Sequence, residues 1–158
     1  MVSYEGKTVV SVTVNGEIHE LIARPSDLLL DVLREQLGLT AAKPGCKNGD
    51  CGACTIVVDG WPVKSCLMLA VEAENHVIVT VEGLDKKNDV QRAFVDSNAF
   101  QCGYCTSGFL MVCHALKMQN PVFPKEEIIE EWLQSNLCRC TSYEEIRKAV
   151  KMMYDQHL

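Results

Sequence analysis

The stretch GCKNGDCGACT at residues 45–55 holds three cysteines and three glycines in eleven positions. Cys46, Cys51 and Cys54 have the spacing C-x4-C-x2-C, and Cys66 follows after eleven intervening residues. Three cysteines at this spacing, with a distant fourth, form the ligand pattern of a plant-type [2Fe–2S] cluster. Because glycine accepts positive φ, this loop can wrap closely around a cluster and direct backbone N–H groups at its sulfurs.

Two other interpretations of this first group are a zinc site and buried structural thiols. Structural zinc prefers paired knuckles of the C-x2–4-C kind, and Cys51 with Cys54 would form one of them. The x4 spacing and the glycine content favour iron–sulfur over zinc.

A second set of four cysteines forms two close pairs, each directly before an expected helix: Cys102, Cys105, Cys138 and Cys140. The helices are expected at 106–119 and 143–155. Free N–H groups and the positive end of the helix dipole favour thiolates and an anionic cluster at such positions. On ligand count alone, zinc would also fit this set. The first group upstream favours a second [2Fe–2S] cluster, because two neighbouring clusters form an electron path.

The remaining cysteine, Cys113, lies on an apolar helical stripe with Phe109 and Leu116, so we expect a buried, structural side chain. A disulfide framework is disfavoured by the odd total of nine cysteines and by the reducing compartment expected for this chain. The four histidines are scattered and are expected to be structural or solvent-facing: His19, His76, His114 and His157.

Composition narrows the possible partners and location. The chain has 158 residues, with 15 basic against 21 acidic side chains and a formal net charge of −6. It has no polybasic arm, so nucleic acid is not an expected partner. No apolar run reaches the roughly 18 residues of a membrane span. Residues 1–8 lack the apolar core of a secretory signal, so we expect a cytoplasmic protein.

Hydrophobic periodicity changes near residue 80. Before it, alternation predicts strands at 7–14, 18–23, 55–58 and 77–81, with turns at Asn15-Gly16 and Asp59-Gly60. A short helix is expected at 28–37, with Ser26 or Asp27 as its N-cap.

After residue 88 the period becomes helical, with four apolar stripes that predict a small bundle. Pro124 marks a possible helix start. Thr141 with Glu144, or Ser142 with Glu145, would form a capping box for the last helix. The polar stretch at 82–88 is the expected junction, which gives two domains at 1–82 and 88–158.

Three motifs together resemble a known family: GCKNGDCGACT at 45–55, QCGYCT at 101–106 and NLCRCT at 136–141. They look like the small subunit of molybdenum hydroxylases, a family that includes xanthine dehydrogenases, aldehyde oxidoreductases, carbon monoxide dehydrogenase, nicotinate dehydrogenase and 4-hydroxybenzoyl-CoA reductase. The similarity runs from about Thr8 to Met153.

The resemblance implies an α+β protein, with an N-terminal β-grasp, ferredoxin-like domain followed by a C-terminal four-helix bundle domain. It also implies a large partner subunit carrying molybdopterin and, in many members, a medium subunit carrying FAD. The residues matching Gln101 and Cys140 lie beside the pterin in that family, and the N-terminal cluster lies nearer the flavin. Ser107 and Ser142 depart from its usual Pro and Gly, and neither change removes a ligand.

We therefore expect an electron-transfer subunit of an oxidoreductase, whose substrate chemistry takes place on another chain. The eight cysteines act as ligands, and no residue of this chain makes or breaks substrate bonds. Two alternatives are a free-standing two-cluster electron carrier and a zinc-stabilised interaction protein. The helical half argues against the first, because a ferredoxin needs only the first ~80 residues.

Overall fold

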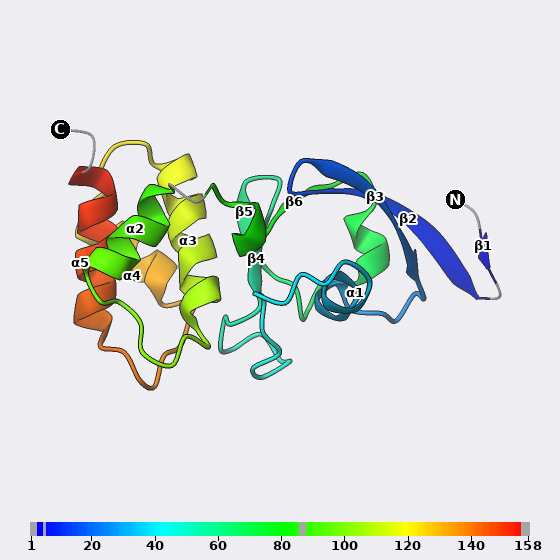
Figure 1. Cartoon of the computed structure of the whole chain (residues 1–158), viewed down its shortest axis with the longest axis horizontal. Helices are drawn as coiled ribbons and strands as arrows, with labels where there is room; N and C mark the ends of the chain where they lie inside the picture. Colours follow the sequence, from blue (N-terminus) through cyan, green and yellow to red (C-terminus); the bar gives the residue numbers. More distant parts are fainter. Residues whose placement is uncertain (1–2, 5, 86–87, 156–158) are drawn as a thin grey trace.

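The computed structural model describes residues 3–4, 6–85 and 88–155. The first part contains β1 (Ser3–Tyr4), β2 (Lys7–Val14), β3 (Glu17–Ala23), α1 (Leu29–Gln36), β4 (Thr55–Val58), β5 (Trp61–Lys64) and β6 (Val77–Val79). Two short 3-10 turns, η1 (Ala70–Ala73) and η2 (Val81–Gly83), flank β6. The second part contains α2 (Asp89–Asp96), α3 (Thr106–Gln119), α4 (Glu126–Leu133) and α5 (Tyr143–Asp155). Below, the part with β1–β6 and α1 is the sheet half, and α2–α5 form the helical half. Figure 1 shows the two halves side by side along the longest axis.

The sheet is mixed, with the order β1-β2-β6-β4-β5 and β3 paired to β2. β2 and β6 are parallel, and the other pairs are antiparallel. Asn15 and Gly16 have φ values of 53° and 87°, and Asp59 and Gly60 have 48° and 85°. Two successive residues with positive φ match the twist of an antiparallel hairpin. Both predicted turns are therefore confirmed as hairpin turns.

Alternation along β2 places one face of the sheet against α1. Val10, Val12 and Val14 are buried, as are Leu29 and Leu33 of the helix. Side chains two residues apart in a strand point to the same face, so these valines form one layer of the core. The same core extends to the buried thiols of the first cysteine group.

Three predictions about the sheet half were wrong in detail: the start of the first helix, its N-cap and the end of the last strand. The first helix begins at Leu29 without a side-chain cap. Asp27 instead accepts the Arg24 N–H at 2.9 Å, and the Leu29 N–H donates to the Met68 carbonyl. The strand expected at 77–81 ends at Val79. The Thr80 N–H donates to the Asn15 side chain at 2.9 Å, and the chain then turns.

β5 was not predicted, because Pro62 lies within it. Proline cannot donate to a strand ladder, so it is tolerated only at a sheet edge. β5 is at such an edge, and β4 is the one described strand that pairs with it.

In the helical half, α2–α5 surround a shared apolar core that includes Phe94, Phe109, Leu116, Ile146 and Met153. The mixed α+β fold is thus confirmed. The helix expected near Pro124 begins two residues later, at Glu126. Ser142 accepts the Glu144 N–H at 3.1 Å, which caps the start of α5. Of the expected junction at 82–88, residues 86 and 87 lie outside the described residues.

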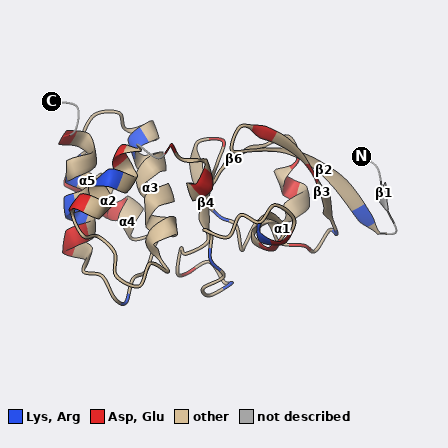
Figure 2. Ribbon diagram, viewed as in Figure 1, with Lys and Arg blue, Asp and Glu red and all other residues tan. Residues whose placement is uncertain are grey.

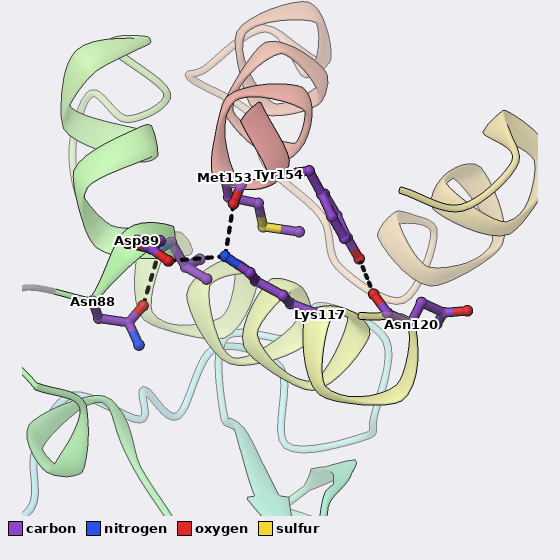
Figure 3. A network of polar contacts seen from close by, with 7 residues as sticks. Asn88, Asp89, Lys117, Asn120, Met153 and Tyr154 are labelled. Carbon is purple, nitrogen blue, oxygen red and sulfur yellow. Dashed lines mark hydrogen bonds and ion pairs between the residues drawn. The ribbon is translucent and has the colours of Figure 1, made fainter. Parts of the chain in front are cut away.

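A polar network joins the ends of α2, α3 and α5 (Figure 3). Lys117 donates to the Asp89 carboxylate at 2.9 Å and to the Met153 carbonyl at 2.7 Å. Tyr154 donates to the Asn120 carbonyl at 2.8 Å. Carbonyls in the last turn of a helix lack intrahelical partners, so Lys117 satisfies one that α5 leaves open.

The two halves pack directly on one another. β4 lies against α3, and a small core of Val57, Leu84, Met111 and Ala115 fills the space between them. The Trp61 and Trp132 rings stack across the same boundary, with centroids 6.3 Å apart. Among the described helices, none is both long enough and apolar enough to cross a membrane.

Candidate metal centres

The first cysteine group lies in the loop between α1 and β4, and Cys66 follows β5. Cys54 and Cys66 are buried, whereas Cys46 is exposed. The Ser65 hydroxyl donates to the Cys54 carbonyl at 2.7 Å, which fixes the segment after β5 beside the segment before β4. This contact brings Cys66 next to Cys54. Burial, followed by the neighbouring Cys54 thiol, raises the pKa of Cys66 to about 11.

Backbone N–H groups surround the exposed thiol of this group. Cys51 N–H donates to Cys46 Sγ at 3.3 Å. The N–H groups of Asn48 and then Cys51 lower the pKa of Cys46 to about 6. Lys47, Gly49 and Gly52 all have positive φ, which turns the loop around the sulfurs.

The loop leaves little room beyond its sulfurs. A Cβ on Gly45 would lie 2.6 Å from Cys51 Sγ, so a larger residue at this position would displace that thiol. The spacing in sequence predicted such a cradle, and the geometry fits a sulfur-ligated group in it.

The second cysteine group comes from the loops that precede α3 and α5. Thr141 N–H donates to Cys138 Sγ at 3.1 Å. Burial and then the Cys138 thiol raise the pKa of Cys105 to about 12. The neighbouring Cys102 thiol raises the pKa of Cys140. The start of α3 and the loop before α5, distant in sequence, therefore bring their four thiols together.

Each group of four divides into two pairs of neighbouring thiols, in each of which one thiol shifts the pKa of the other: Cys46 with Cys51, Cys54 with Cys66, Cys102 with Cys140, and Cys105 with Cys138. Two pairs suit a cluster of two irons, in which each iron binds two thiolates. A structural zinc would instead need four ligands around one point. Among the described residues, which include all nine cysteines, no three His, Cys, Asp or Glu side chains converge as single-ion ligands.

The two groups face a common hollow. Its volume is about 300 Å³, and its lining includes Cys46, Cys51, Cys102, Cys138 and Cys140. The fold thus brings both cysteine groups to one place, although they lie in different halves of the chain.

The other singled-out residues are not members of the thiol pairs. Cys113 is fully buried, and burial raises the pKa of its thiol to about 12. Gln101 is exposed beside Cys102. His76 contacts Asp59 at 2.5 Å in a turn of the sheet half. His157 lies outside the described residues.

Comparison with known proteins agrees with this geometry. The profile described as "2Fe-2S iron-sulfur cluster binding domain" matches residues 12–78, and the one described as "[2Fe-2S] binding domain" matches residues 80–151. The chain is 43% identical over 148 residues to the nicotinate dehydrogenase small FeS subunit of Eubacterium barkeri, covering 92% of this chain and 94% of that one. This chain belongs to the family of small iron–sulfur subunits of molybdenum hydroxylases.

Solved structures extend the agreement from sequence to the whole fold. The subunit superposes on quinoline 2-oxidoreductase from Pseudomonas putida 86 with a TM-score of 0.89 at 41% identity, covering 96% of both chains. Against aldehyde oxidoreductase from Desulfovibrio desulfuricans the TM-score is also 0.89, at 39% identity. There the match covers 94% of this chain but only 17% of the other. The iron–sulfur subunit is an electron-transfer subunit of an oxidoreductase.

Two residues near the sites were missed by the sequence interpretation. Asn136 stands in the NLCRCT motif, where only the cysteines were given a role, yet it is 0% exposed and bonded to the first cysteine loop. Tyr143 OH accepts the Cys138 N–H at 3.0 Å and donates to the Asn136 carbonyl. A polar residue directly before a ligand loop was the available signal for Asn136.

Proposed function

We propose that this subunit carries electrons from a molybdopterin-containing large subunit, through two [2Fe–2S] clusters, toward an FAD-containing medium subunit or another acceptor. The observation that supports this most is the arrangement of eight thiols in two groups, both of which contribute cysteines to one hollow. A relative of similar length, from Eubacterium barkeri, is named as a small FeS subunit, and we therefore place the remaining chemistry on other chains.

The ligands of the first cluster are Cys46, Cys51, Cys54 and Cys66, and those of the second are Cys102, Cys105, Cys138 and Cys140. Each cluster, when bound, accepts and releases one electron. The protein supplies thiolates, N–H donors to sulfur and a partly buried setting, and these set the reduction potential. No residue of this chain takes part in bond-making at the substrate.

The large subunit docks around the second site. Phe100, Tyr104 and Leu137 are 40%, 47% and 55% exposed close to Cys102 and Cys140. The loops at 97–105 and 134–142 contain a single charged residue, Arg139, and charges gather instead on α2, α4 and α5 (Figure 2). Exposed apolar groups of this kind mark an interaction surface. By resemblance, Gln101 and Cys140 then lie on the pterin side.

The match to a small part of aldehyde oxidoreductase supports a partner of this kind. In aldehyde oxidoreductase the matched segment makes up 17% of one much longer chain. A separate subunit of the same fold must make equivalent contacts through an interface. We propose domains at 1–82 and 88–158, a β-grasp sheet followed by a four-helix bundle, and a cytoplasmic location.

Metal and sulfide analysis of the anaerobically purified complex tests the function. Two clusters require about four irons and four sulfides per subunit. Two irons and two sulfides per subunit would mean that one cysteine group does not hold a cluster. Zinc with little iron would favour the zinc-stabilised alternative. Gel filtration of the native protein then separates a complex from a free-standing carrier.

Gln101→Leu tests the pterin-side assignment. This variant should keep both clusters, because glutamine is not a ligand. It should slow the reduction of both clusters by substrate without changing their reduction by dithionite, as followed by rapid-freeze EPR. Unaltered substrate kinetics would exclude a role for Gln101 at the interface.

A further inference from the structure

One lysine of the sheet half reaches across to the loop before α5, which carries Cys138 and Cys140 of the second cysteine group. Lys64 is the last residue of β5, two positions before Cys66. Its ammonium donates to the Ser135 carbonyl and lies 3.4 Å from Asn136 Oδ1. Among the described residues, no carboxylate forms an ion pair with Lys64. Its charge is therefore directed at the other half of the molecule.

Asn136 receives this contact and extends it to the first cysteine loop. Its side chain is fully buried, and Nδ2 donates to the Gly52 carbonyl at 3.2 Å. The next N–H along the chain, that of Leu137, donates to the Cys51 carbonyl at 2.9 Å. Cys51 and Cys138 are thus separated by one hydrogen bond and a few covalent bonds.

Two glycines make this approach possible. A Cβ on Gly52 would lie 2.1 Å from Asn136 Oδ1, and a Cβ on Gly108 would lie 2.2 Å from the Gly52 carbonyl oxygen. Both distances are far inside van der Waals contact, so larger residues would separate the halves. We call the set Gly52, Lys64, Gly108, Ser135 and Asn136 the interdomain joint.

We propose that Lys64, acting through Asn136, is a positioning residue that keeps the two cluster loops in contact and so sets the rate of electron exchange between the clusters. This inference rests on the proposed function. Electron tunnelling slows exponentially with distance, so a small separation of the halves would slow the transfer strongly. The lysine touches neither cluster site directly, and its effect passes through the Ser135–Asn136 turn.

The test compares Lys64→Met, which keeps the apolar stem and removes the donor, with Lys64→Arg, which keeps a charged donor. Lys117→Met is a matched control, because Lys117 is also half-buried and bonded to a carbonyl but lies at the far ends of α2, α3 and α5. All three variants are made in the whole complex, and iron content is measured first.

Three readouts follow on the iron-loaded protein: the spin–spin splitting of the two reduced clusters, the rate of electron transfer between them, and hydrogen exchange at the Leu137 N–H. Lys64→Met should reduce the splitting, slow the transfer by about tenfold or more and speed exchange at Leu137. Lys64→Arg should keep the splitting, the transfer rate and the exchange rate of the unmodified subunit. Lys117→Met should change none of them, whatever its effect on stability.

Unchanged splitting, transfer and exchange in Lys64→Met would overturn the proposal while leaving the electron-transfer function intact. Absence of iron from the unmodified complex would instead overturn the proposed function. Equal changes in Lys64→Met and Lys117→Met would show that the effect is general destabilisation, which also overturns the positioning role. The exchange measurement does not depend on activity, so it remains decisive if the complex turns over poorly.

Discussion

Replacing Gly108 by alanine tests whether the contact between the halves outweighs local helix propensity. Gly108 lies in the first turn of α3. In an exposed helix interior, alanine stabilises by about 1 kcal/mol relative to glycine. Here the new Cβ would lie 2.2 Å from the Gly52 carbonyl oxygen and 2.6 Å from Asn136 Nδ2. The first of these atoms is backbone, so no side-chain rotation can relieve the contact.

The sizes of three opposing contributions decide whether Gly108→Ala raises or lowers the free energy of unfolding. Overpacking costs about 1–3 kcal/mol, and loss of the buried bond from Asn136 to Gly52 adds about 1–3 kcal/mol. After the propensity gain of about 1 kcal/mol is subtracted, the free energy of unfolding should fall by roughly 3 kcal/mol. For a protein of this size that is a Tm decrease of about 6–12 °C.

Thermal unfolding of the cluster-loaded subunit, followed by circular dichroism, measures this change. Ser107→Ala is the matched control, since it adds no atoms at the neighbouring position. The Ser107 hydroxyl is buried without a hydrogen-bond partner among the described residues, so its removal should leave Tm equal or higher. A Gly108→Ala variant as stable as the unmodified subunit would refute the close approach of the two halves.

Three further outcomes are expected. Cys113→Ala should keep both clusters and lower the free energy of unfolding by about 1 kcal/mol, the cost of a small buried side chain, and iron analysis with denaturant titration checks both. Cys51→Ser should remove the EPR signal of the first cluster alone, and Cys105→Ser that of the second; loss of both signals from either variant would contradict independent sites. The Arg147 side chain lowers the pKa of Glu130, so this pair stabilises the fold above the ordinary value of 4.5 and less as pH falls below it. Glu130→Gln should therefore flatten acid unfolding curves in that range, and an unchanged slope would exclude the linkage.

Local patterns in the sequence determined much of the secondary structure. Asn15-Gly16 predicted its hairpin because two adjacent residues with positive φ suit few other sequences. The apolar period around Phe109 and Leu116 predicted α3, because side chains at that spacing share one face of a helix. The predicted N-cap of α1 was wrong, because Asp27 could accept from more than one backbone N–H. Only the packed chain selects the Arg24 N–H.

Cysteine spacing also indicated two ligand groups, yet it could not show which thiols pair. Cys54 lies next to Cys66, and Cys102 next to Cys140, through loops that come together only when each half has folded. The same holds for Asn136, whose bond to Gly52 joins residues 84 positions apart. Spacing and periodicity in the sequence reflect the local conformation of residues that are close along the chain. Contacts between distant loops depend on how whole elements pack, and so the tertiary structure alone decided that the two cysteine groups share one hollow.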